Sequence, residues 1–475
     1  MPTQVRFEAG SYRDRDGRVF YGEDGEVYRA LSRQALSEWE AVRAARFFKK
    51  AMADGRVVRT DMVARPPGER EGYEETWAAV LQHEPIPFVS YPYEWSFGML
   101  KDAALLHLDL LQAALDANVT LKDGTAYNVQ FVGSRPVFID VASFERLAAG
   151  QPWAGYRQFC QTFLYPLLLQ AYKNIAFHSF LRGCLAGISP VECARLMSLR
   201  DLVRPGVLTH VWLHARLEAD RGLAQNNLQQ ALPRAGFDKA LIKNNIAGLA
   251  RIINRLNWSP SESTWSTYAG NNTYSEGDRR RKAAFVREAV ASRPPDLVWD
   301  LGCNTGEYSL IAAEHARYVV AMDADHLAVE RLYQFLKSPS RPAAAGTILP
   351  LVSNVADPAP NLGWRGAERK SLEARGRPDL TLCLALVHHL VIDAGIPLHD
   401  LLAWLAGLGT DLVIEFVAKG DSMVEALLRN RRDACADYGQ EHFEQCLNEF
   451  FDVARSEALE SGTRTLYHAL ARPTS

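Results

Sequence analysis

Short apolar runs alternate with amphipathic stretches over residues 276–475, and this alternation is the most regular feature of the chain. Apolar runs of about four to eight residues indicate buried strands, whereas apolar positions spaced by three or four indicate helices. The predicted order is helix 278–292, strand 296–300, helix 307–315, strand 317–323, helix 326–337, strand 347–352, strand 379–386, helix 396–406 and strand 411–417. This order predicts an α/β fold with a doubly wound, Rossmann-like parallel sheet.

The first two hundred residues have a different pattern. An Asp24-Gly25 turn flanked by two strand-like runs predicts a β-hairpin over 17–31. Helical spacing of apolar residues predicts helices over 32–53 and 96–118. Pro205-Gly206 marks a break, and residues 207–256 carry helical periodicity again. We therefore expect three parts: 1–204, an α+β domain; 205–275, a helical connector or lid; and 276–475, the doubly wound domain.

Acids and glycines follow the first two strands of the doubly wound part. The first strand ends at Asp300, and the second ends at Asp323, 23 residues later. Ligands of such sheets bind beyond the carboxyl ends of the strands, and an acid at the second strand can accept hydrogen bonds from ribose hydroxyls. Glycines in the first turn let a ligand approach the backbone. The predicted site for an adenosine-containing ligand comprises Asp300, Gly302, Cys303, Asn304, Gly306 and Asp323.

The spacing D-x-G-x-N-x-G differs from the G-x-G-x-x-G of dinucleotide enzymes. It resembles motif I of class I S-adenosylmethionine (SAM) methyltransferases, with Asn304 where glycine is commonest. Together, D-L-G-C-N-T-G, L-A-L-V-H-H-L and I-E-F-V-A-K-G-D resemble a bacterial group of two-part SAM methyltransferases that includes a nodulation-associated protein. The resemblance implies SAM as the cofactor, an adenine contact from Asn354 or alternatively Asp357, and a reversed final hairpin within 451–470.

Three further side chains are candidates for catalysis. His388 and His389 follow the fourth strand, and a histidine with a pKa near 6.5 suits proton removal at neutral pH. Glu415, in the fifth strand, would close the acceptor pocket or act as the base. The expected reaction is direct in-line methyl transfer to oxygen or nitrogen of a small-molecule, glycan or lipid-type acceptor. Two alternatives stay open: the histidines only shape the next helix, and the protein binds SAM without catalysis as an interaction protein.

A second constellation lies in the N-terminal part. Asp123 and Asn128, followed by a strand that ends at Asp140, resemble the catalytic loop and metal-binding acid of the protein-kinase and aminoglycoside-phosphotransferase superfamily. The resemblance implies that Asp123 orients an acceptor hydroxyl while Asn128 and Asp140 hold magnesium. The family's glycine-rich loop and strand lysine are missing; Arg29 is the nearest basic residue. The domain is thus a degenerate kinase-like fold, an active phosphotransferase that makes the protein bifunctional, or neither, with these residues in ordinary turns.

Composition excludes several other classes of protein. The 475 residues carry a net charge of −3, which argues against bulk nucleic-acid binding. The seven cysteines form no C-x-x-C pair, which fits a reducing cytoplasm. The apolar run 163–169 is too short for a membrane span. We expect a cytoplasmic protein without a membrane span whose partner is a small-molecule acceptor; outside the kinase-like case no metal is expected, and the oligomeric state is left open.

Overall fold

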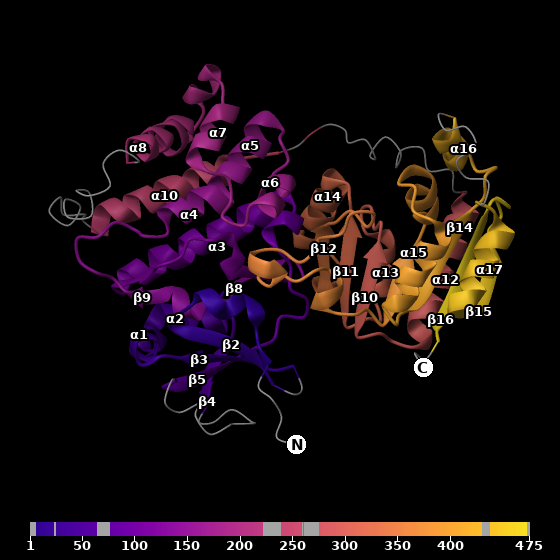
Figure 1. Cartoon of the computed structure of the whole chain (residues 1–475), viewed down its shortest axis with the longest axis horizontal. Helices are drawn as coiled ribbons and strands as arrows, with labels where there is room; N and C mark the ends of the chain where they lie inside the picture. The colour runs from indigo at the N-terminus through magenta and orange to yellow at the C-terminus, as the bar shows by residue number, and fades with distance from the viewer. Residues whose placement is uncertain are drawn as a thin grey trace. The chain divides into compact units, whose positions relative to one another are not determined.

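The structure, a computed structural model, describes residues 6–22, 25–63, 77–221, 239–258, 260, 275–429 and 438–472 (Figure 1). The chain forms two compact units. Unit 1 comprises Met1–Ser259 and Asn361–Arg369; unit 2 comprises Pro260–Pro360 and Lys370–Ser475. Nine residues from within the C-terminal half therefore belong to unit 1. The expected three-part division stays a prediction, because 222–238 and 261–274 of the connector lie outside the described residues.

Unit 2 is built on a seven-stranded sheet with the order β12-β11-β10-β13-β14-β16-β15. Its strands are β10 (Leu297–Leu301), β11 (Tyr318–Asp323), β12 (Ile348–Val352), β13 (Leu380–Cys383), β14 (Asp411–Val417), β15 (Phe451–Ala458) and β16 (Arg464–Ala471). The first five pair in parallel, whereas β16 runs antiparallel to β14 and β15. The predicted doubly wound sheet is confirmed, and it ends in a reversed hairpin as the resemblance implied.

One helix precedes these strands and the others lie between them in sequence. They are α12 (Glu276–Ser292), α13 (Glu307–Ala312), α14 (His326–Lys337), α15 (Leu398–Gly407), α16 (Ser422–Leu428) and α17 (Gln440–Phe450), with the short turns η9 (Ala343–Thr347), η11 (Glu373–Arg375) and η12 (His389–Asp393). The expected strand 379–386 is shorter than predicted. It ends at Cys383 because Ala385 adopts a left-handed conformation, with φ +51°, which no strand accommodates.

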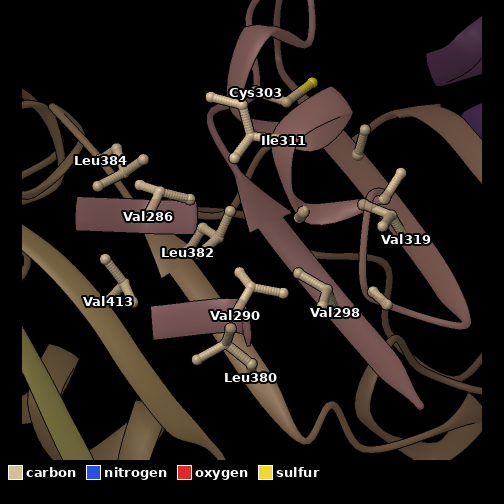
Figure 2. Close-up of a cluster of buried hydrophobic side chains, with 14 of the residues drawn as sticks. Val286, Val290, Val298, Cys303, Ile311, Val319, Leu380, Leu382, Leu384 and Val413 are labelled. Atoms are coloured by element: carbon tan, nitrogen blue, oxygen red, sulfur yellow. The ribbon is translucent and has the colours of Figure 1, made fainter. Parts of the chain in front are cut away.

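One part of the core of unit 2 lies between α12 and the parallel strands. In Figure 2, Val286 and Val290 of α12 lie over Val298 of β10 and Leu382 of β13. These four side chains are fully buried. Burying such a side chain contributes about 1.5–3 kcal/mol, so this contact fixes the first helix against the centre of the sheet.

Unit 1 contains a five-stranded antiparallel sheet with the order β1-β2-β3-β5-β4. Its elements are β1 (Arg6–Phe7), η1 (Ala9–Arg13), β2 (Gly17–Tyr21), β3 (Val27–Leu31), α1 (Arg33–Ala44), α2 (Arg46–Ala53), β4 (Thr60–Val63) and β5 (Ala79–His83). The hairpin over 17–31 is confirmed, although Asp24 in its turn lies outside the described residues. The single helix expected over 32–53 is wrong: Ala45 is extended, with ψ 135°, and separates α1 from α2.

The remainder of unit 1 is mainly helical. It comprises η2 (Pro92–Glu94), α3 (Phe97–Asp116), β6 (Val119–Leu121), η3 (Ala126–Asn128), β7 (Val129–Val132), β8 (Arg135–Phe138), η4 (Val141–Ser143), β9 (Phe144–Arg146), α4 (Tyr156–Phe159), η5 (Cys160–Leu164), α5 (Tyr165–Lys173), α6 (His178–Gly183), α7 (Pro190–Leu196), η6 (Leu199–Val203), η7 (Val207–Trp212), α8 (Leu213–Arg221) and α10 (Lys239–Arg255). Helix α10, from the expected connector, packs on α3. Among the described helices, none is long and apolar enough to cross a membrane.

Candidate functional site

The turn after β10 is held tightly against the neighbouring strand. The amides of Gly302 and Cys303 both donate to the carbonyl oxygen of Met322 in β11, at 2.8 and 3.0 Å. Gly302 has a φ of +74° and Gly306 a φ of +83°, a region in which a side chain is strained. Asn304, with φ +50°, shares this conformation, which asparagine tolerates better than most residues. These two hydrogen bonds and the left-handed residues hold the backbone of the predicted ligand loop against β11.

Asp323 joins this loop to the end of the second strand. One carboxylate oxygen accepts a hydrogen bond from the amide of Asn304 at 2.8 Å, and the other accepts one from the amide of Asp325 at 2.8 Å. Burial raises the pKa of Asp323, and these two bonds oppose the rise. The structure thus brings the predicted glycine loop and the second acid into direct contact. Their contact with a nucleoside stays a prediction.

Asp300, at the end of β10, is almost completely buried, with 2% of its surface exposed. It accepts a 2.5 Å hydrogen bond from the hydroxyl of Ser309 in α13. Burial raises the pKa of Asp300 to about 6, while the Ser309 bond and the positive charge of Lys282 oppose this rise. Asp300 therefore anchors the start of α13 beneath the loop. Sequence reasoning missed Ser309, although its position one turn into the helix after the loop was visible.

The two candidate histidines adjoin each other after β13, with ring centroids 4.2 Å apart. His388 is 1% exposed, and its Nδ1 has no hydrogen-bond partner in the described part of the chain. Burial lowers the pKa of His388 well below its usual value and that of His389 to about 4. Both rings are consequently neutral at pH 7 and keep a nitrogen lone pair. Removal of an acceptor proton by either one stays a prediction.

Glu415 occupies a buried ionic network that the sequence did not reveal. Its two carboxylate oxygens contact Lys282 Nζ of α12 at 2.7 Å and Arg464 Nη1 of β16 at 3.3 Å. Arg464 also contacts Asp421, with its Nε 2.8 Å from that carboxylate. All four side chains are at most 4% exposed. A carboxylate held between two cations is a weak base, so this geometry favours a structural role for Glu415 and disfavours proton transfer.

The loop after β12 begins beside Asp323. The amide of Ser353 donates to the backbone carbonyl of Asp323 at 2.8 Å. Asn354 is exposed, and its side-chain oxygen accepts a hydrogen bond from the amide of Ala356 at 3.0 Å. Asp357 closes the same turn through its amide, which donates to the Asn354 carbonyl. Asn354 thus lies at the correct strand end, and its contact with adenine stays a prediction.

The N-terminal constellation is also brought together, within unit 1. Arg29 of β3 forms an ion pair with Asp140 at 3.0 Å and a longer one with Asp14 at 3.5 Å. Burial and the nearby charge of Asp140 raise the pKa of Asp123. Asn128 is 9% exposed, and its carbonyl accepts the amide of Ile139. Within the described ranges, no group of three or more His, Cys, Asp or Glu side chains is arranged to hold a metal ion.

Comparisons with known proteins give one relative that extends over nearly the whole chain. This is the nodulation protein NoeA of Rhizobium meliloti (strain 1021), which is 36% identical over 468 residues, covering 97% of this chain and 95% of that protein. An uncharacterized protein of Methanothermobacter thermautotrophicus is 47% identical over 49 residues, which are 10% of this chain and 19% of that one. No family model matches the sequence.

Solved structures with a similar fold include two methyltransferases. The N-methyltransferase NodS from Bradyrhizobium japonicum WM9 has 14% sequence identity and a TM-score of 0.30, covering 42% of this chain and 98% of its own. The magnesium protoporphyrin IX methyltransferase ChlM from Synechocystis PCC 6803, with bound SAM, has 16% identity and a TM-score of 0.28, covering 45% of this chain and 87% of its own.

Proposed function

The chain belongs to the family of the nodulation protein NoeA, and from that premise we propose that unit 2 is a SAM-dependent methyltransferase. The observation that carries the proposal is the hydrogen bond between the Asp323 carboxylate and the Asn304 amide. It joins a glycine-bearing loop to an acid at the carboxyl edge of a doubly wound sheet, where ligands of such sheets bind. The motifs D-L-G-C-N-T-G and L-A-L-V-H-H-L resemble those of SAM methyltransferases, which supports SAM as the nucleoside of this site.

Asp323 can hold a ribose without releasing the loop. Each carboxylate oxygen has two acceptor positions, and each uses one for a backbone amide, from Asn304 and Asp325. The amide of Ala324 also bonds to this carboxylate, so at least one of its four acceptor positions is left for a ribose hydroxyl. The left-handed Gly302 and Gly306 let the rest of the nucleoside approach the backbone.

SAM supplies a methyl group on a positively charged sulfur, which makes the methyl group electrophilic. The protein's contribution is to align the acceptor and exclude water. His389, which is partly exposed and neutral at pH 7, is the proposed proton acceptor for a hydroxyl or amine. The more deeply buried His388 supports its ring from one side. The acceptor is an oxygen or nitrogen of a small molecule, or of a glycan or lipid-type molecule.

Two measurements test the proposal. Titration calorimetry should show binding of S-adenosylhomocysteine by the full chain, and labelled SAM should transfer its methyl group to a component of a bacterial small-molecule and glycolipid extract. Failure to bind S-adenosylhomocysteine, or preferential binding of NAD, would remove the methyltransferase assignment. Binding without any labelled product would favour the alternative of a non-catalytic SAM-binding interaction protein.

A second candidate function concerns unit 1. The ion pair between Arg29 and Asp140 supports a kinase-like domain, because it places a basic residue of the third strand, β3, beside the acid that follows β8. The sheet order β1-β2-β3-β5-β4, with α1 and α2 between β3 and β4, also supports it. We propose magnesium-ATP as the ligand of this unit. Calorimetry should detect binding that is lost in Asp140→Ala, and wild-type protein that binds no magnesium-ATP would remove this candidate.

A further inference from the structure

The nine residues Asn361–Arg369, here named the docking segment, lie in sequence between β12 and β13 but belong to unit 1 (orange in Figure 1). The segment is closed on itself: the amides of Leu362 and Arg369 each donate to the other residue's carbonyl, at 2.9 and 3.1 Å. Gly363 and Gly366 have φ values of +83° and +66°, which a loop this tight requires. The segment therefore has a definite shape, with η10 (Trp364–Gly366) at its tip.

Glu368 anchors this segment to η1. Its carboxylate accepts hydrogen bonds from the Tyr12 hydroxyl at 2.7 Å and from two nitrogens of Arg13, at 2.6 and 3.1 Å. It also accepts a hydrogen bond from the amide of Trp364 at 2.8 Å, so the same side chain shapes the loop and binds η1. The Glu368 side chain is 9% exposed. A bidentate arginine–carboxylate pair of this kind specifies orientation as well as affinity.

Two further contacts fit the segment to the same unit. The guanidinium of Arg369 lies over the ring of Tyr127, 4.2 Å from its centroid, and the rings of Tyr12 and Trp364 are 5.4 Å apart. Gly10 fits closely as well, because a Cβ at that position would lie 2.8 Å from the backbone oxygen of Glu368. The two backbones therefore lie so close that a methyl group added at Gly10 would displace the docking segment.

The chain between the two anchor points carries the predicted adenine contact. Residues 353–360 begin at the Ser353 amide, which is bonded to the Asp323 carbonyl, and end where the docking segment begins. Ordering a free backbone costs about 1–2 kcal/mol per residue. Because both ends of 353–360 are anchored, a ligand that binds Asn354 has less of this ordering cost to offset. We propose that docking of Asn361–Arg369 on unit 1 and binding of SAM in unit 2 strengthen each other. The inference rests on the proposed SAM site.

The decisive variant is Gly10→Ala, because it displaces the segment without altering any residue of unit 2. Glu368→Gln removes the charge from the other side of the same interface. Both variants should bind S-adenosylhomocysteine about five- to tenfold more weakly than wild type, at the lower end of typical coupling. The matched control is Gly248→Ala in α10, where an added Cβ meets no atom within 4 Å; it should bind as wild type does.

Coupling is reciprocal, so hydrogen exchange gives a second measurement. S-adenosylhomocysteine should slow amide exchange in 361–369 and in η1 of the wild-type protein, and this slowing should be lost in Gly10→Ala. If wild type binds S-adenosylhomocysteine but both variants bind it equally well and exchange in η1 does not respond, the coupling is refuted while the SAM site stands. If wild type does not bind it at all, the proposed function itself fails.

Discussion

Replacing Glu415 by glutamine tests whether the buried ionic network supports the fold or serves catalysis. The substitution keeps the shape of the side chain but removes the carboxylate that forms an ion pair with Lys282 at 2.7 Å. Glu415 is 0% and Lys282 2% exposed, so the lysine would lose its hydrogen-bonded carboxylate where little water can replace it. Breaking a buried pair in this way costs about 3–5 kcal/mol. That is a large part of the roughly 5–15 kcal/mol that stabilises a typical domain.

The stability of unit 2 must be measured separately, because a chain with two units does not give a single well-defined transition. Urea-dependent hydrogen exchange of the β14 amides reports that unit directly. The matched control is Asp452→Asn, which breaks an exposed pair with Arg472 and should cost at most about 1 kcal/mol. The double variant Lys282→Met/Glu415→Leu should recover part of the loss, since both buried charges are then removed.

The result that would refute this reasoning is specific. If Glu415→Gln leaves exchange in β14 unchanged, but abolishes methyl transfer while the affinity for S-adenosylhomocysteine stays at the wild-type value, Glu415 acts on the proton of the acceptor. The ion pair with Lys282 would then serve to set its pKa and would contribute little to stability.

Three other predictions follow from the geometry. Asp323→Ala should weaken binding of S-adenosylhomocysteine at least about tenfold in calorimetry, because hydrogen bonds to a charged group contribute about 1.5–3 kcal/mol each; unchanged affinity in a folded variant would contradict the site. If His389 removes the acceptor proton, the rate of labelled methyl transfer should rise with a midpoint near pH 4, following its lowered pKa; a midpoint near 6.5 would exclude it. His107→Leu should stabilise unit 1 by about 1–2 kcal/mol in exchange experiments at pH 7, since neither ring nitrogen has a hydrogen-bond partner in the described part of the chain. Burial lowers the pKa of His107 to about 3 in the folded protein, whereas a histidine in the unfolded chain has a pKa near 6.5. Below pH 6.5 the unfolded chain therefore binds more protons than the folded one. The wild type should accordingly lose stability as the pH falls from 6.5 towards 3, and the variant should lose less. A destabilised His107→Leu protein would refute this.

Local pattern was enough to predict the doubly wound sheet and the contact between its first two strand ends. Consecutive parallel strands usually pair, so acids placed at their ends by the sequence meet in space; Asp323 and the loop at Asn304 follow this rule. Burial of both faces made the strands continuous apolar runs. Where local geometry departs from the pattern, as at Ala45 and Ala385, the apolar spacing carried no signal, because a single residue's dihedral angles do not change it.

The partners of buried charges were decided by tertiary structure alone. Lys282 stands in a helix rich in arginine and looks like part of a solvated face, yet it pairs with Glu415, 133 residues away. Likewise, Glu368 of the docking segment accepts a hydrogen bond from Tyr12 across 356 residues, and both residues belong to unit 1. Hydrophobic periodicity determines which face of an element is buried, because it repeats along the chain. Neutralising a buried charge depends on which distant element folds beside it, and no local repeat in the sequence records that.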